Sequence, residues 1–281
     1  MRAMARAGSI NYQVSNIIKS VNGIGTSKKE NRDNSGVKSA ESGHKISDKV
    51  HSYKSLDNLR DNLTNLAKYA KSEHQIKDMS KIDSKIIGDW IKSKEIIYHS
   101  ASNYLSEINK VSDHLSISRE EVKTLRAELR KELPTKELTT RYYKNLDRVQ
   151  MPDRSQPAFE LQRDYGLRVS ASTSINLDKQ LDGNILKYQE KGGKWSEKEL
   201  SSSLVSKIKE NAVNGKYEMN NRTYTRDLKE AIESQTKNIF NGTHGIRHSY
   251  AQNQLEAGKS KAEVTQSMGH SREEITNTYL R

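Results

Sequence analysis

The segment that begins at Thr243 combines two histidines, an arginine and a tyrosine in a spacing that could support phosphoryl transfer. His244 and Arg247 lie three positions apart at the predicted start of a helix, so both side chains project from one face. His270 and Tyr279 follow further along the chain. Arginine can neutralise phosphate oxygens, tyrosine can attack phosphorus, and histidine or lysine can move protons. Such a set could transfer a phosphoryl group without a metal ion.

Local signals place these residues at helix ends and junctions. A helix N-terminus offers free backbone N–H groups that suit an anion. Gly269 precedes His270 between two predicted helices, where a glycine permits a sharp turn and a close approach. A lone His-x-x-Arg pair usually marks a solvated helix face, so the ordered set carries the prediction. Tyr165 and Tyr250 are rival nucleophiles in principle, but Tyr250 shares a helix with Arg247 and fits a core position.

The ordered set resembles a known family. Thr243–Leu280 resembles the second motif block of the tyrosine recombinases (phage integrase and Xer-like), which reads His-x-x-Arg, Gly-His and then the nucleophilic tyrosine. Gly166–Ser170 resembles the first block of that family, Gly-Leu-Arg-x-Ser. The resemblance implies four catalytic side chains besides the nucleophile Tyr279, namely Arg168, His244, Arg247 and His270.

The family also places a catalytic lysine in a β-hairpin after the first arginine. The stretch Glu190-Lys191-Gly192-Gly193-Lys194 resembles the Gly-Lys-Gly-x-Lys turn of that hairpin. The resemblance implies that Lys191 protonates the leaving 5′ oxygen, and Lys194 is the alternative. The family often has an acidic residue three positions after the first arginine, where this chain has Ala171. We therefore expect this support of the site to be missing or supplied elsewhere.

The resemblance further implies how the protein would act. Two domains would clamp double-stranded DNA, and Tyr279 would form a 3′-phosphotyrosine that a 5′-hydroxyl reseals. We expect no cofactor and no metal, a tetramer on paired DNA sites, accessory DNA-bending proteins as further candidate partners, and a role in integrating or excising a mobile element. Two alternatives stay open: a weak or inactive DNA-binding relative that regulates, and a type IB topoisomerase-like enzyme. A basic helical scaffold would leave the ordered motifs unexplained.

Composition agrees with a DNA-binding protein. The 281 residues suffice for two ordinary domains, and a net charge of +12 favours a polyanionic partner, although lysines also serve simple solvation. The chain has no cysteine, which excludes disulfides and thiolate metal sites. His244 and His248 have metal-compatible spacing but lack a nearby third ligand. Without an apolar run long enough for a membrane or a signal peptide, we expect a cytoplasmic, nucleoid-associated protein.

We predict a mainly α fold with a small antiparallel β-sheet (α+β) in three parts. Residues 1–46 carry eight Lys or Arg against three Asp or Glu and form a basic extension. Within it, 9–22 is a short helix that docks on its own domain or binds a partner, and 23–44 is a flexible linker. Residues 47–118 form a helical core-binding domain that contacts DNA. Residues 119–281 form the catalytic domain.

Hydrophobic periodicity predicts the elements of the two larger parts. In the helical domain, a helix capped by Ser55 buries Leu56, Leu59, Leu63, Leu66 and Ala70, and two more helices carry Ile86, Ile87, Trp90 and Ile91 and then Tyr104, Leu105, Ile108, Val111 and Leu115. In the catalytic domain, a helix from 119 to about 133 precedes Pro134, another ends near Gly166, and strands at 172–177 and 183–188 pair in a sheet. Further helices follow at 198–212, 225–240, 244–257, 261–268 and 272–280, with capping boxes at Ser260–Glu263 and Ser271–Glu274.

Overall fold

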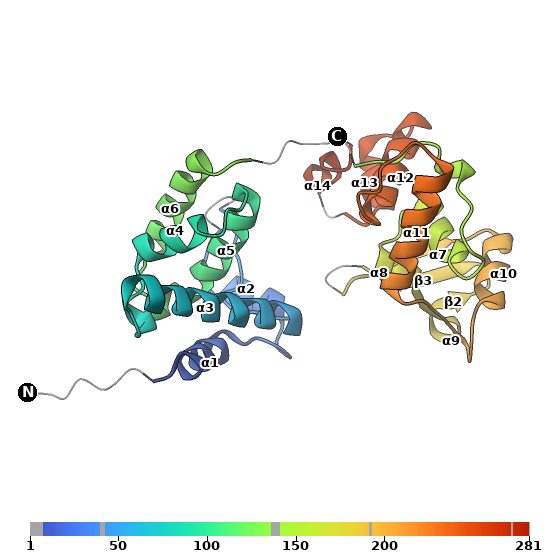
Figure 1. Cartoon of the computed structure of the whole chain (residues 1–281). Helices are drawn as coiled ribbons and strands as arrows, with labels where there is room; N and C mark the ends of the chain where they lie inside the picture. The colour runs from blue at the N-terminus through green and yellow to red at the C-terminus, as the bar shows by residue number, and fades with distance from the viewer. Residues whose placement is uncertain (1–7, 40–42, 136–140, 191–192, 271, 281) are drawn as a thin grey trace, which may run out of the picture. The chain divides into compact units, whose positions relative to one another are not determined.

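A computed structural model describes residues 8–39, 43–135, 141–190, 193–270 and 272–280. The chain divides into two compact units, Met1–Glu137 and Leu138–Arg281 (Figure 1). The described residues are mainly α-helical, which confirms the predicted fold class, and they hold two small antiparallel sheets where one was predicted. Across the described ranges, no helix is both long and apolar enough to cross a bilayer.

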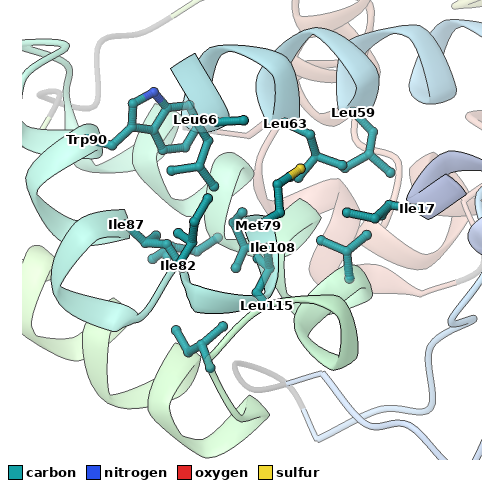
Figure 2. Packing of buried hydrophobic residues seen from close by; sticks show 14 of the residues in the cluster. Ile17, Leu59, Leu63, Leu66, Met79, Ile82, Ile87, Trp90, Ile108 and Leu115 are labelled. Carbon is teal, nitrogen blue, oxygen red and sulfur yellow. The ribbon is translucent and has the colours of Figure 1, made fainter. Parts of the chain in front are cut away.

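The first unit is a helical bundle with an apolar core. Figure 2 shows Leu59, Leu63 and Leu66 in one cluster with Trp90 and Ile108, so the predicted stripes are confirmed as core. Ser52, rather than the predicted Ser55, caps the long central helix. The helices are α1 (Ile10–Val21), α2 (Lys28–Asn34), α3 (Tyr53–His74), α4 (Ser84–Lys92), α5 (Tyr98–Val111) and α6 (Arg119–Glu132).

Helix α1 docks on its own domain, which confirms one of the two alternatives predicted for 9–22, and the first unit therefore begins before the predicted start at residue 47. Val14, Ile17 and Val21 of α1 are buried in the core, and Ile17 is visible among the core residues in Figure 2. Val50 N–H donates to the Val21 carbonyl at 2.8 Å. The predicted linker 23–44 contains α2, which starts at its N-cap Ser27 and buries no side chain. Its lack of an apolar stripe explains why periodicity missed it.

The boundary between the units lies after α6, which corrects the predicted boundary at 118/119. Val122 and Leu129 of α6 belong to the first unit's core. The Arg126 guanidinium of α6 donates to the Ser102 carbonyl at 3.1 Å and to Ser106 Oγ at 3.0 Å, both on α5. The sequence shows that α6 is amphipathic, but it does not show which neighbour covers its apolar face.

The second unit combines helices with two sheets. Its helices are α7 (Gln156–Tyr165), α8 (Val169–Ser172), α9 (Leu177–Gln180), α10 (Ser202–Glu210), α11 (Asn221–Gln235), α12 (His244–Glu256), α13 (Lys261–Ser267) and α14 (Glu273–Asn277). Its strands are β1 (Ser174–Asn176), β2 (Leu181–Asp182), β3 (Ile185–Gln189), β4 (Trp195–Glu199) and β5 (Lys216–Glu218), in the sheet orders β1-β5 and β2-β3-β4.

The sheet pairing differs from the prediction. The strands predicted at 172–177 and 183–188 do not pair with each other. Instead Ile175 of β1 lies opposite Tyr217 of β5, whereas β3 forms a hairpin with β4. The predicted helix 198–212 begins only at Ser202, because its first residues end β4. The polar stretch Trp195–Glu199 lacks the apolar alternation that marks a half-buried strand. Its sequence therefore did not predict the strand β4.

Helix α12 has an unusual environment. Seven consecutive residues, 245–251, are buried, including Arg247, His248 and Ser249. A helix that is covered on every side normally carries apolar residues all round. Here α12 carries charged and polar side chains into the interior, next to α7 and α13. This placement sets up the candidate site.

Candidate active site

Arg247 is the most deeply buried charged residue of the site, with 2% of its surface exposed. Its guanidinium donates hydrogen bonds to the carbonyls of Gly166 and Met268, which lie at the C-terminal ends of α7 and α13. These helix ends are partly negative and favour a cation. Nε of Arg247 is buried without a hydrogen-bond partner among the described residues. Burial lowers the pKa of the guanidinium, but arginine stays charged in proteins.

Arg168 is placed by the sharp junction between α7 and α8. Gly166 ends α7 with φ of 68°, and a Cβ there would approach the Tyr250 ring to within 3.0 Å, so this position requires glycine. Arg168 then caps α8 and forms an ion pair with the Glu190 carboxylate. Its side chain remains 26% exposed. Burial, followed by the nearby charge of Arg247, lowers the pKa of Arg168.

His270 is held between Arg247 and a threonine. Its Nε2 lies 3.3 Å from Arg247 Nη2, and its Nδ1 lies 2.8 Å from Thr276 Oγ1. Burial, followed by the charges of Arg247 and Arg168, lowers the pKa of His270 to about 4, so the ring is neutral at pH 7. Arginine can only donate, so Nε2 accepts from Arg247 and the Nδ1–H donates to Thr276. Thr276 also hydrogen-bonds to Thr265, which fixes the ring further.

Tyr279 is surrounded by three histidines. Its hydroxyl lies 2.8 Å from His244 Nε2. The centroid of its ring lies 4.6 Å from the ring centroid of His248 and 4.9 Å from that of His270. Although part of His244 is exposed, desolvation of its ring, followed by the charges of His248 and Arg247, lowers the pKa of His244 to about 4. A neutral His244 can accept the phenolic proton at Nε2.

A cavity of about 430 Å³ opens beside these groups. Lys194 lines it, at the turn between β3 and β4. Lys191, the predicted general acid, lies outside the described residues, as does Ser271 of the predicted capping box. The cavity thus brings together two cations, Arg168 and Lys194, and its other polar wall residues are Glu190, His244, His270 and Tyr279.

The structure adds two residues to the site that sequence reasoning did not assign to it, His248 and Glu190, and it gives Lys198 an electrostatic interaction with Arg247. His248 is 3% exposed and stacks on Tyr279, whereas the sequence indicated only a rejected metal spacing. Lys198 of β4 donates to the Ser267 carbonyl at 2.7 Å, and burial lowers the pKa of this lysine to about 8. The position of Lys198 gave no signal because it was predicted to be helical. Glu190 was noted only as part of the lysine-rich turn.

Comparison with known proteins agrees with the motifs. The model of the phage integrase family matches residues 117–281, more than half of the chain and the whole second unit. The chain therefore belongs to the phage integrase family, the tyrosine recombinases, which confirms the resemblance. No curated protein sequence gave a significant match.

Solved structures of this family share the fold at low sequence identity. The recombinase XerH bound to difH is 14% identical, with a TM-score of 0.61 over 97% of this chain and 92% of that chain. A lambda integrase dimer bound to a core site is 16% identical, with a TM-score of 0.61 over 82% and 89% of the chains. The Tn1549 transposon integrase in complex with transposon right end DNA is 12% identical, with a TM-score of 0.56 over 98% and 95%.

Proposed function

We propose that the protein is a site-specific DNA recombinase that cuts and rejoins DNA through a phosphotyrosine at Tyr279. The observation that carries the proposal is the placement of the Tyr279 hydroxyl 2.8 Å from His244 Nε2, at the cavity that Arg168 also lines. A nucleophile, a neutral base and an exposed cation thus meet where a phosphodiester could bind.

In the first step, the scissile phosphate binds in this cavity. The exposed edge of Arg168 pairs with a non-bridging oxygen, and the fixed charge of Arg247 stabilises the negative charge that develops on the phosphoryl group. Such fixed cations act strongly because the surrounding site is partly desolvated. His270, oriented by Arg247, completes the wall of the site.

In the chemical step, Tyr279 Oη forms a bond to phosphorus while the bond to the 5′ oxygen breaks. His244 Nε2 takes the phenolic proton, and a lysine of the β3–β4 turn, Lys191 or Lys194, gives a proton to the 5′ oxygen. The product is a 3′-phosphotyrosine and a free 5′-hydroxyl. The phosphotyrosine ester keeps the bond energy, so attack by a 5′-hydroxyl reverses the step without ATP.

The proposed substrate is double-stranded DNA that carries paired recombination sites. The net charge of +12 supports this substrate, as do the DNA complexes of XerH, lambda integrase and the Tn1549 integrase. We infer a tetramer on paired sites, a role in moving a mobile element, and action in the cytoplasm on the nucleoid. Deleting the gene should abolish the junctions of the excised element, and unchanged junctions would contradict that role.

Covalent trapping tests the proposed chemistry. The protein is incubated with DNA fragments from the flanks of its own gene, quenched in detergent and examined for a DNA adduct. We expect an adduct with the wild type and with the control Tyr165→Phe, and none with Tyr279→Phe. Salt-sensitive binding without an adduct would indicate an inactive DNA-binding relative. An adduct that persists in Tyr279→Phe would refute the assignment of the nucleophile.

A further inference from the structure

Glu190 is a buried carboxylate at the edge of the candidate site. Its side chain is 4% exposed and forms an ion pair with Arg168, which is 26% exposed. Carboxylates are seldom buried this far unless a cation or several donors compensate them. Oε1 of Glu190 is buried without a hydrogen-bond partner among the described residues. The ion pair with Arg168 is therefore the main compensation that the structure describes for this charge.

The backbone around Glu190 fixes where the carboxylate points. Glu190 N–H donates to the Lys194 carbonyl at 2.7 Å, and Gly193 N–H donates to the Glu190 carbonyl at 3.0 Å, so both ends of the turn are tied. Gly269 forms the opposite wall. A Cβ at Gly269 would lie 2.7 Å from Glu190 Cδ, and its φ of 65° also favours glycine. The glycine before His270 thus leaves the space that the carboxylate occupies.

We propose that Glu190 is a positioning residue that orients the Arg168 guanidinium toward the scissile phosphate. This inference rests on the proposed function. Glu190 is buried and contacts the covered side of the Arg168 guanidinium, whereas Arg168 is partly exposed. The exposed side of Arg168 is therefore left for the substrate. Arginine is long and has many rotamers, so a fixed partner keeps it ready for the anion.

The residue one helical turn after Arg168 cannot provide this support. Ala171 N–H donates to the Arg168 carbonyl at 2.9 Å, and the alanine side chain packs against the apolar core of the second unit. A carboxylate at 171 would lie on the same face of α8 as Arg168. The hairpin turn therefore supplies the acidic group that α8 lacks. This predicts that a carboxylate moved to position 171 partly replaces the one at 190.

The charge of Glu190 gives the proposal a distinctive kinetic signature. A negative charge beside the cavity opposes phosphate binding, yet orienting Arg168 favours the transition state. Glu190→Gln should therefore slow adduct formation about 10- to 100-fold while DNA affinity stays equal or increases. A purely structural role would instead weaken binding and lower the melting temperature together.

The test combines a DNA-free and a DNA-dependent measurement on the full chain. Nitrogen-15 NMR follows the arginine Nε–H signals, with the Arg168 signal assigned from Arg168→Lys. Single-turnover adduct formation and DNA binding are measured on the gene-flank fragments. The variants are Glu190→Gln, Glu190→Asp and Glu190→Gln combined with Ala171→Glu. The matched control is Glu197→Gln, an exposed carboxylate on β4 of the same hairpin.

We expect Glu190→Gln to shift or broaden the Arg168 signal and to slow the adduct, the double variant to recover part of the rate, and Glu197→Gln to match the wild type. If Glu190→Gln does not fold, Glu190→Asp decides, because it keeps the charge and should show an intermediate rate. An unchanged Arg168 signal with an unchanged rate would overturn the proposal. A wild type that forms no adduct would refute the proposed function instead, while the NMR signal still tests whether Glu190 orients Arg168.

Discussion

The two units of this protein use buried residues for different purposes. In the first unit, α3 buries an apolar stripe that includes Leu63 and Leu66, and its polar face stays in solvent. In the second unit, α12 buries Arg247 and His248 beside a tyrosine. Apolar burial stabilises a fold, whereas buried charge costs free energy unless it is paired. The second unit also has an apolar core, so the contrast lies in α12, whose buried Arg247 is compensated by carbonyls at two helix ends.

Buried side-chain atoms without a hydrogen-bond partner among the described residues occur in both units, Arg119 Nε of the first unit among them. Arg247 Nε, His248 Nδ1 and Glu190 Oε1 have no hydrogen-bond partner among the described residues. All three lie within or directly beside the candidate site. A phosphodiester offers only acceptor oxygens, so the proposed substrate could satisfy the N–H of Arg247 Nε but not Glu190 Oε1, which is itself an acceptor.

The largest effect should come from removing the buried arginine. Arg247→Ala removes a fixed charge and two carbonyl hydrogen bonds, so adduct formation should fall about 100-fold or more. The melting temperature of the second unit should fall as well. Arg247→Lys, which keeps the charge but not the fork of donors, serves as the control and should recover only part of the loss. A wild-type rate in Arg247→Ala would remove this residue from the site.

A core substitution in the first unit should lower stability without changing the rate of the covalent step. Leu63 is fully buried, so Leu63→Ala should lower the free energy of unfolding by about 2–5 kcal/mol through the cavity it leaves. Chemical denaturation with a probe in each unit would measure it. The covalent step, measured on the folded fraction, should keep its wild-type rate. A slower covalent step would mean that the first unit's core also shapes the site.

Acid should weaken the second unit through its histidines. The pKa values of His244 and His270 are lowered to about 4 in the folded state, below the usual value of 6.5. The unfolded chain therefore binds more protons between about pH 4 and 6.5, and the stability of the second unit should fall as pH drops through this window. Thermal melts of the wild type and of His270→Gln would test it. An equal pH slope in the variant would contradict the assigned shift.

A smaller effect is expected from Lys198, the partly buried lysine of β4. Burial lowers the pKa of Lys198 to about 8 from the usual 10.5. The unfolded state holds this proton up to a higher pH, so Lys198 should make stability rise with pH between about 8 and 10.5. Lys198→Met keeps most of the length of the side chain without a charge and should flatten that rise. A steeper rise in Lys198→Met would show that the lysine of the folded protein keeps its charge between about pH 8 and 10.5, which would contradict the lowered pKa.

Hydrophobic periodicity predicted where a helix lies along the chain better than it predicted which other element packs against it. The stripe of α3 and the helix at 10–21 followed from apolar spacing, which is a local property. The docking of α1 in the first unit and the pairing of β1 with β5 depend on contacts between distant segments, which spacing does not encode. β4 was missed because its residues are mostly polar.

The candidate site shows the same division. His244, Arg247, His270 and Tyr279 could be predicted from their order, and the structure brings them together around one tyrosine ring. The ion pair of Arg168 with Glu190 could not, because it joins the α7–α8 junction to a hairpin turn. The absence of an acidic residue at Ala171 was the one signal that a distant carboxylate was needed.

The most direct test of the account is to identify the atom that carries the DNA. The trapped adduct is digested with protease and nuclease, and the modified peptide is sequenced by mass spectrometry. We predict a nucleotide attached through its 3′ phosphate to the oxygen of Tyr279. A nucleotide on another residue, or one attached through its 5′ phosphate, would contradict the proposed chemistry.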